Sequence, residues 1–170
     1  SYQIDKKDIV PTVSLLITAH NEDKVIADKI ENALSLDYPQ DKQEILVASD
    51  CSTDRTDEIV RGYANHGVIL NAIRHRGGKT SAQNQTVPLA KGDIIVFSDA
   101  NSMYAKDALM KLVRNFKDPS VGAVSGRLTF TNTNDTSVSA GEELYWRYEN
   151  FLRHLESESG SCITANASIF

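Results

Sequence analysis

Four short apolar runs, separated by segments with helical spacing, constrain the fold of this chain more than any other feature. The runs cover residues 13–18, 45–48, 68–73 and 94–97, and polar or turn-forming residues bound each of them. Apolar runs of this length are typical of strands that are buried on both faces. Strands that alternate with helices form an α/β domain, in which helices flank a mostly parallel sheet.

The intervening segments have the spacing of amphipathic helices. Residues 23–34 place apolar side chains on one helical face. Thr53 or Asp54 can cap a second helix, which follows the second strand. We expect further regular structure after this, namely helices at 79–90, 109–116 and 144–155 and an extended segment at 121–130.

Length and composition indicate one ordinary globular domain. The 170 residues include 18 Lys and Arg against 23 Asp and Glu, so the net charge is −5. This balance argues against broad nucleic-acid binding, which needs a basic face. Cys51 and Cys162 form neither a disulfide framework nor a zinc pattern, which favours a reducing compartment. The final CITANASIF stops inside a strand-like segment, so we expect a fragment of a longer protein.

A polar cluster follows each predicted strand. In order, the clusters read TAHNE, SDCSTD, RHRGGKT and SDANS. In an open parallel sheet, ligands bind beyond the carboxyl ends of the strands, where these clusters lie. One such cluster is typical of an ordinary turn, but four at the same edge predict a ligand site.

The last cluster predicts a cation site. Asp99 and Asn101 are two residues apart, so an extended turn can direct both side-chain oxygens to one side. A hard divalent cation prefers oxygen ligands and takes the rest of its coordination shell from water and phosphates. The alternative is that Asp99 or Ser102 caps the following helix.

The third cluster predicts an anion site. Lys79 stands at a glycine-rich helix start, where its charge and free backbone N–H groups suit an anion. The sequence GGKT resembles the end of a P-loop, but Ile73 occupies a position that needs glycine, so an ATPase is not expected. The alternative for Lys79 is a solvated surface lysine.

The first two clusters offer less specific groups. Asp50 can accept a hydrogen bond from a base or a ribose, and small Ala19 permits close approach of a ligand to the backbone. Asn21 and Asp54 can instead cap helices, and Glu22 is favourable near the positive end of one.

Several enzyme classes are disfavoured. His20 has no nucleophilic serine or cysteine with a third partner, and the dinucleotide pattern G-x-G-x-x-G is absent. A doubly wound phosphohydrolase needs an aspartate at the end of the first strand, where Thr18, Ala19 and His20 stand.

Together, the four clusters resemble the motifs of the family 2 glycosyltransferases, which have the GT-A fold. The first family motif ends in Asn-Glu, as TAHNE does, and the second resembles DCSTD at residues 50–54. The third is a lysine in a Gly-rich turn before A-x-N, as in GKTSAQN, and the fourth is a D-x-D metal motif, here DAN. The later LYWRYENFLRHLES and TANAS resemble, less specifically, membrane polysaccharide synthases of this family.

The resemblance implies that residues 1–170 form a single nucleotide-sugar-binding domain, Rossmann-like and truncated at its C-terminal end. It also implies a nucleotide-sugar donor, a UDP-sugar above all, bound by Ala19, Glu22, Asp50, Lys79 and Asp99. Mg²⁺ or Mn²⁺ would lie on Asp99 and Asn101 and stabilise the departing diphosphate. A carboxylate would take a proton from the acceptor hydroxyl, with inversion at the anomeric centre.

The same resemblance implies the partners and the location. The acceptor would be a saccharide or a lipid-linked molecule, and no nucleic acid is expected. The chain would be a soluble domain at the cytoplasmic face, attached to a membrane through the full-length protein.

The chain departs from the family pattern in two ways. Asn101 replaces the last acid of D-x-D, so we expect a cation to bind more weakly or to depend more on Asp99 and the diphosphate. The family's base lies downstream of a segment like TANAS, so we place it beyond Phe170 and name no catalytic residue. Glu142 and Glu143 are possible substitutes, but they begin an amphipathic helix, where acids are favourable anyway. We therefore predict a fragment that binds donor but transfers sugar poorly or not at all.

Two other functions remain open. A nucleotidyltransferase also uses a metal and an α/β sheet, and it would release diphosphate from a nucleoside triphosphate. A non-catalytic nucleotide-sugar-binding module is favoured if Asn101 abolishes metal use. The aromatic stripe at residues 145–151 is interpreted as a helix packed on the sheet or as a platform for an acceptor sugar.

Overall fold

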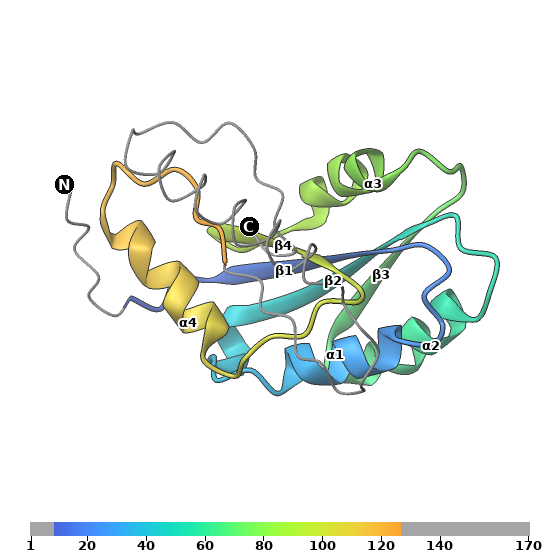
Figure 1. Ribbon diagram of the computed structural model, residues 1–170, viewed down its shortest axis with the longest axis horizontal. Coiled ribbons are helices and arrows are strands. Elements are labelled where there is room, and N and C mark those ends of the chain that lie inside the picture. Colours follow the sequence, from blue (N-terminus) through green and yellow to red (C-terminus); the bar gives the residue numbers. More distant parts are fainter. Residues whose placement is uncertain (1–8, 127–170) are drawn as a thin grey trace, which may run out of the picture.

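The computed structural model describes residues 9–126, in which strands and helices alternate along the chain (Figure 1). The strands are β1 Val13–Ala19, β2 Gln43–Asp50, β3 Val68–Ile73 and β4 Ile94–Asp99. The helices are α1 Ile26–Leu34, α2 Thr56–Gly62, α3 Lys79–Thr86 and α4 Ala108–Val113. Short 3₁₀ helices lie at Gln40–Lys42, Ala64–His66, Val87–Leu89 and Arg114–Lys117.

The four described strands form one parallel sheet with the order β3-β2-β1-β4. Since β2 and β3 extend on one side of β1 and β4 lies on the other, the strand order reverses beside β1. Loops that leave the carboxyl ends of these strands therefore converge at one edge of the sheet. We call this edge the carboxyl rim; it comprises residues 18–23, 49–55, 74–79 and 99–102.

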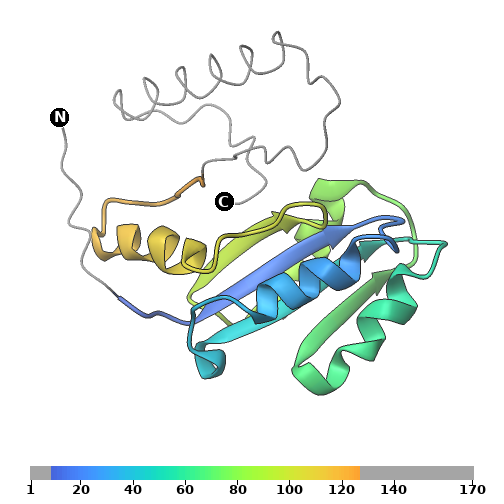
Figure 2. The ribbon, with the colours of Figure 1, turned by 60° about the horizontal axis from the view of Figure 1, so that its bottom comes forward.

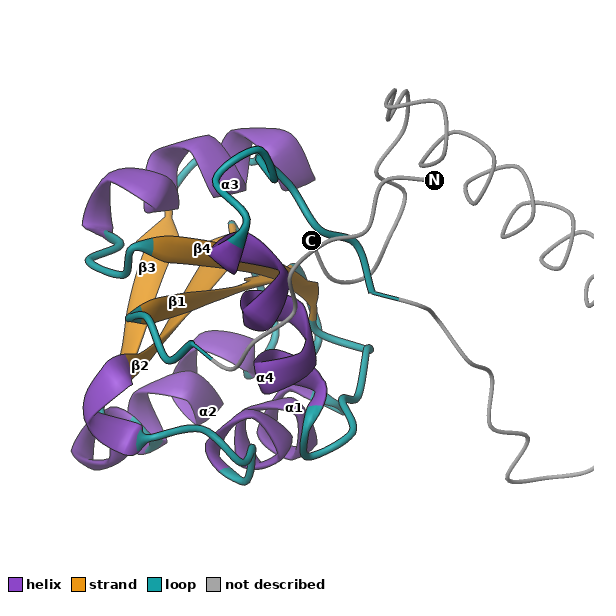
Figure 3. Ribbon diagram, turned by 90° about the vertical axis from the view of Figure 1, so that its left-hand side faces the viewer, coloured by secondary structure: helices purple, strands orange, loops and turns teal. Residues whose placement is uncertain are grey.

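Helices cover both faces of the sheet (Figures 2 and 3). Helices α1, α2 and α4 lie on one face, and α3 lies on the other. A chain of parallel strands needs such crossover helices, because each strand must return to the starting edge before the next one begins. Both faces of the sheet are therefore buried, which explains the nearly continuous apolar runs in the sequence.

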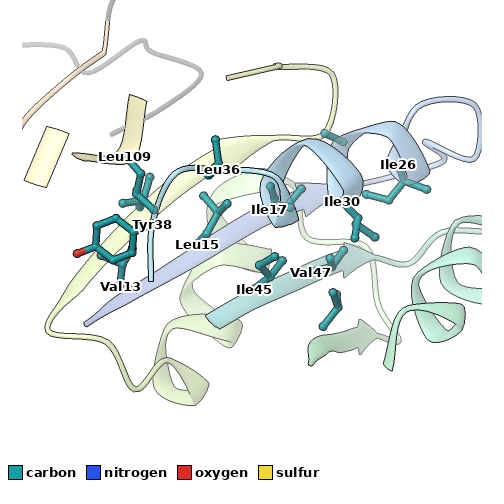
Figure 4. Close-up of a cluster of buried hydrophobic side chains, with 14 of the residues drawn as sticks. Val13, Leu15, Ile17, Ile26, Ile30, Leu36, Tyr38, Ile45, Val47 and Leu109 are labelled. Carbon is teal, nitrogen blue, oxygen red and sulfur yellow. The ribbon is translucent and has the colours of Figure 1, made fainter. Parts of the chain in front are cut away.

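The main core lies between the sheet and α1, with α4 at its end (Figure 4). Val13, Leu15 and Ile17 alternate along β1 toward this core, and each is at most 1% exposed. Ile26 and Ile30, one turn apart on α1, are fully buried against them. Burying one such side chain stabilises the fold by about 1.5–3 kcal/mol, so these contacts fix α1 against the sheet.

A smaller cluster lies under α3 and consists of Leu16, Ala48, Ile73 and Ala82. Because side chains alternate along a strand, Thr18 and Asp50, two residues beyond Leu16 and Ala48, face the same side. Asp99 is in register with Thr18 and therefore faces this side too. Toward the carboxyl rim, the sheet face under α3 thus changes from apolar to polar.

The observed helices differ from the predicted ones mainly at their ends. Helix α1 begins at Ile26 rather than near residue 23, because residues 23–25 form a turn. The third helix was expected to reach residue 90, but it is α-helical only to Thr86. Pro88 has no backbone N–H, so the chain continues there as a 3₁₀ turn. The fourth helix likewise ends as a 3₁₀ turn at Arg114–Lys117.

Several predicted features lie outside the described residues. They include the helix at 144–155 with its aromatic stripe, Glu142, Glu143 and Cys162. Residues 121–126 are described and form no strand, and the rest of the expected extended segment lies beyond them. Between residues 9 and 126, no helix has the length and apolar character that crossing a membrane requires.

Candidate functional site

Asp50 ends β2 and is buried, with only 3% of its surface exposed. Its two carboxylate oxygens accept hydrogen bonds from the backbone N–H groups of Gly77 (2.9 Å) and Gly78 (2.8 Å). Asp50 therefore fastens the loop between β3 and α3 to the end of β2. A carboxylate has about four lone-pair sites, so Asp50 retains acceptor capacity for a base or a ribose.

Two glycines shape the loop that Asp50 fastens. Gly78 has φ 82° and ψ 170°, a conformation that is essentially restricted to glycine. A Cβ atom on Gly77 would lie 2.3 Å from the Oγ of Ser81, closer than real atoms approach. These glycines place Lys79 at the first position of α3. The N–H groups of these two glycines already bind Asp50, so an anion at this loop would meet the side chain of Lys79 and the N–H groups of the first turn of α3.

An ion pair crosses the carboxyl rim between α3 and β4. The Nζ of Lys79 lies 2.6 Å from Oδ1 of Asp99. The two side chains are 45% and 34% exposed, so a ligand can reach both. Together with the bonds from Asp50 to the glycine loop, this pair connects the ends of β2 and β4 through Gly78 and Lys79.

The loops after β1 and β2 bind mainly each other. Asn21, which has a φ of 55°, accepts a hydrogen bond from the N–H of Thr53 (2.8 Å). Its own N–H donates to the Oγ of Ser52 (3.1 Å). Asn21 is therefore a link between loops rather than a cap of α1. Asp54 accepts from the N–H of Thr56, the first residue of α2, at 2.9 Å, as expected for a residue at a helix start.

Ala19 lies apart from the other predicted site residues. It is 2% exposed and belongs to the main core, so its methyl group faces α1. Asp50 and Asp99 face the side of α3 instead. A ligand at the carboxyl rim can therefore approach Ala19 only through its backbone.

Glu22 and His20 support the rim from the first loop. The N–H of Glu22 donates to the Oγ1 of Thr56 (2.8 Å), and Glu22 is half-buried where the turn into α1 begins. The Nδ1 of His20 lies 2.7 Å from the carbonyl oxygen of Asp50, to which it must donate, because a carbonyl only accepts. His20 is thus a polar residue of the rim.

The donor atoms at the end of β4 fit a cation that shares its ligands with a phosphate. Asn101 is exposed and follows Asp99 in a turn that the N–H of Ser102 closes by donating to the carbonyl of Asp99 (3.3 Å). Within residues 9–126, no group of three His, Cys, Asp or Glu residues could hold a metal by itself. Mg²⁺ is typically bound through only one or two carboxylates plus substrate phosphates, which matches one carboxylate and one amide.

Lys29 is a buried residue near this turn that the sequence interpretation missed. It is fully buried on α1, and its Nζ donates a hydrogen bond to the carbonyl oxygen of Ser102. The same Nζ lies 3.5 Å from the centroid of the Tyr104 ring. Burial lowers the pKa of Lys29 to about 7, although the negative charge of Asp99 opposes the shift. The sequence did indicate its burial, because Lys29 lies three residues after Ile26 and therefore on the apolar face of the helix.

Comparison with known proteins identifies relatives for most of the chain. The model of the family described as glycosyl transferase family 2 matches residues 14–169. Beta-monoglucosyldiacylglycerol synthase of Nostoc sp. is 34% identical over 145 residues, which cover 83% of this chain and 31% of that protein. Poly-beta-1,6-N-acetyl-D-glucosamine synthase of Staphylococcus aureus is 32% identical over 138 residues, 77% of this chain and 33% of that protein. The chain thus spans about a third of the length of these curated relatives.

Solved structures share the fold. The mannosyltransferase PcManGT from Pyrobaculum calidifontis, in complex with GDP-Man and Mn²⁺, matches with a TM-score of 0.68 and 34% identity, over 73% of this chain and 38% of that one. S. aureus TarS 1-349 in complex with UDP-GlcNAc matches with a TM-score of 0.58 and 25% identity, over 71% of this chain and 37% of that one. The predicted GT-A architecture is confirmed by these likenesses.

Proposed function

This chain belongs to glycosyl transferase family 2, and on that premise we propose that its carboxyl rim binds the nucleotide-sugar donor of a hexosyl-type glycosyltransferase. The donor is a UDP-sugar, and transfer inverts the anomeric centre. Support for a nucleotide sugar comes from the similar structures, since PcManGT is in complex with GDP-Man and TarS with UDP-GlcNAc.

The observation that carries this proposal is the contact path across the rim. Asp50 binds the N–H groups of Gly77 and Gly78, and the next residue, Lys79, forms an ion pair with Asp99. Side chains from β2, α3 and β4 therefore adjoin one place, where a single small molecule can touch all of them. If these residues lay at separate places, one small molecule could not touch all of them.

The surroundings of each residue along this contact path suit one part of the donor. The partly exposed ammonium of Lys79 neutralises charge on the diphosphate. Asp99 and Asn101 would hold the divalent cation, Mg²⁺ or Mn²⁺, which supplies positive charge for the departing diphosphate. Asp50 meets the nucleoside with its remaining lone pairs. Since Asp50 also fixes the glycine loop, nucleoside binding and the position of Lys79 depend on the same carboxylate.

The first loop completes the donor site. Glu22 contributes its side chain beside the start of α1, and Ala19 contributes its backbone, because its methyl group is buried in the core. The hydrogen bonds that join this loop to the loop after β2 hold both in place without the ligand. We therefore propose a donor site that is largely preformed on this side.

Our proposals for the acceptor and the catalytic base concern the whole protein rather than the described residues. We propose that the base lies outside residues 9–126 and that the acceptor is a saccharide or lipid-linked hydroxyl. The names of the relatives, a glucosyldiacylglycerol synthase and a poly-N-acetylglucosamine synthase, support both acceptor classes. The whole protein would act at the cytoplasmic face of a membrane.

A non-catalytic nucleotide-sugar-binding module is the second candidate. One observation favours it: Lys79 already neutralises Asp99, and Asn101 adds no negative charge for a cation. Replacing Asn101→Asp separates the candidates in the complete protein. An enzyme with a weakened cation site gains Mn²⁺-dependent transfer, whereas a binding module gains none.

Calorimetric titration of the chain with UDP, GDP and ADP, each with and without Mn²⁺, tests the proposal. We expect UDP to bind most tightly and Mn²⁺ to strengthen its binding. Equal affinity for all three nucleotides, or no binding of any, would contradict it. Release of diphosphate from UTP by the complete protein would instead identify a nucleotidyltransferase.

A further inference from the structure

Lys29 is an unusual core residue, because its whole side chain, including the amine, is removed from water. It is the largest of the fully buried side chains between residues 9 and 126. Its Nζ contacts two groups that follow β4, the carbonyl oxygen of Ser102 and the ring face of Tyr104. A buried lysine is unfavourable unless such partners stabilise its charge.

Asn32, one turn further along α1, holds the same segment. Its Nδ2 donates to the carbonyl oxygen of Tyr104 (3.0 Å), and its Oδ1 accepts from the N–H of Tyr104 (2.8 Å). Just after α1, the N–H of Asp37 donates to the carbonyl of Lys106 (2.9 Å). The segment after β4 is therefore attached along the length of α1 by backbone-directed bonds. We call Lys29 and Asn32 the α1 clamp.

The α1 clamp acts on the turn that contains the proposed cation ligands. Ser102 directly follows Asn101, and its N–H closes the turn by donating to the carbonyl of Asp99. Its carbonyl oxygen is the acceptor for Lys29. Ser102 is thus held on both sides, and the path from Lys29 to Asp99 passes through a single residue. No contact between Lys29 and the donor is needed for an effect on donor binding.

We propose that Lys29 is a positioning residue, which holds the Asp99–Asn101 turn in the geometry that binds the cation and the diphosphate. The role of this turn rests on the proposed function, whereas the clamp itself rests on the contacts above. A methionine of similar volume at position 29 would fill the same space without a desolvated charge. A lysine there is therefore explained by the hydrogen bond that its Nζ donates to Ser102, not by packing.

A matched pair of substitutions tests this. Lys29→Met removes the bond to Ser102. Lys42→Met removes a bond of the same kind at a half-buried position, since the Nζ of Lys42 donates to the carbonyl of Val10 (2.8 Å). Both variants exchange a lysine that binds a backbone carbonyl for methionine. Lys42 lies at the opposite, amino-terminal end of the sheet, so its loss reports a general structural effect.

The first readout is amide hydrogen exchange in the ligand-free chain. We expect Lys29→Met to increase the exchange rate of the amides of Asn101 and Ser102 severalfold, whereas Lys42→Met leaves them unchanged. Unchanged rates in both variants, or equal increases in both, would overturn the proposal. This readout does not depend on any donor.

The second readout is the affinity for UDP with Mn²⁺. Residues that orient metal ligands typically change metal affinity about 10–100-fold, so we expect a loss in this range for Lys29→Met and none for Lys42→Met. Faster exchange with unchanged UDP affinity would also overturn the positioning role. If the wild-type chain binds no nucleotide, the proposed function fails, and the exchange rates alone decide whether the clamp holds the turn.

A second variant guards against misfolding of Lys29→Met. Asn32 is half-buried, so Asn32→Ala is tolerated more readily and still releases Tyr104 from α1. We expect changes in the same direction as for Lys29→Met, in both exchange at Asn101 and UDP affinity. Lys29→Arg keeps a cationic donor, so we expect exchange at Asn101 and UDP affinity close to those of the wild type, which would separate positioning from packing. If Lys29→Arg folds and changes both readouts as much as Lys29→Met does, the positioning role is overturned.

Discussion

The Nζ of Lys79 lies 2.6 Å from Oδ1 of Asp99, and this ion pair joins the start of α3 to the end of β4. Both side chains are more than a third exposed, at 45% and 34%. Ion pairs with this exposure contribute about 0–1 kcal/mol to stability. The pair therefore adds little to stability, and we assign it to the proposed donor site instead.

Lys79→Met should weaken UDP binding strongly while leaving the fold intact. Loss of a hydrogen bond to a charged group costs about 1.5–3 kcal/mol, which corresponds to about tenfold or more in the dissociation constant. Lys91→Met, at an exposed lysine near the amino ends of the strands, is the control. Calorimetry of both variants checks this prediction, and equal UDP affinities for the two would contradict a role of Lys79 at the diphosphate.

Asp50→Asn should destabilise the chain and also weaken nucleotide binding. The amide offers one oxygen to the N–H groups of Gly77 and Gly78, and its own NH₂ group faces a second donor. An unsatisfied buried group costs about 1–3 kcal/mol, measurable by urea unfolding. Asp93→Asn is the control, because the exposed Asp93 also accepts a backbone N–H, from Thr12 (3.2 Å), far from the rim. If Asp93→Asn impairs UDP binding equally, the rim assignment of Asp50 is wrong.

Gly78→Ala should lower stability and displace Lys79. At φ 82° and ψ 170°, an alanine costs about 1–3 kcal/mol or forces the loop to move. Gly67 also has a positive φ, of 80°, but lies before β3 at the other end of the sheet. Gly67→Ala should therefore show a similar loss in urea unfolding with unchanged UDP affinity. Loss of affinity in both variants would show that general destabilisation, rather than loop position, governs binding.

The stability of the wild type should rise between pH 7 and pH 9 relative to Lys29→Met. Burial lowers the pKa of Lys29 to about 7 from its ordinary 10.5, so in this interval the unfolded chain binds more protons than the folded one. Each pH unit can then add at most about 1.4 kcal/mol to the free energy of unfolding. Urea unfolding of both proteins across this range measures the difference, and parallel pH profiles would contradict a depressed pKa.

That measurement must stop below the titration of the tyrosines. Burial raises the pKa of Tyr38 to about 12 and also raises the pKa of Tyr104. Unfolded tyrosines lose their protons near pH 10, so above that value the folded state binds more protons and stability falls again.

The framework of the fold was predictable from apolar periodicity. The third strand was placed at residues 68–73, as observed, because Gly67 and a run of charged residues bound it. The ends of the helices were less predictable, because hydrogen bonds from other loops help to decide where a helix begins or ends. The start of α1 is such a case, because the N–H of Asp23 donates to the carboxylate of Asp54 (3.1 Å).

The placement of the candidate site residues at strand ends was predictable, but their contacts were not. The sequence places Asp50, Lys79 and Asp99 at strand ends, and the parallel sheet brings these ends to one edge. It does not indicate that Asp50 binds the glycine N–H groups, because that bond joins residues 27 positions apart across a loop. Lys29 was missed for a different reason: its place on an apolar face was visible, but its partners after β4 were not.

Nuclear magnetic resonance of the amide groups during titration with UDP and Mg²⁺ shows whether one rim holds one diphosphate. We expect the largest shifts to occur together, at one dissociation constant, at the amides of Gly77, Gly78, Lys79 and Asp99. Shifts confined to another surface, or separate dissociation constants for the β3–α3 loop and the end of β4, would contradict this expectation.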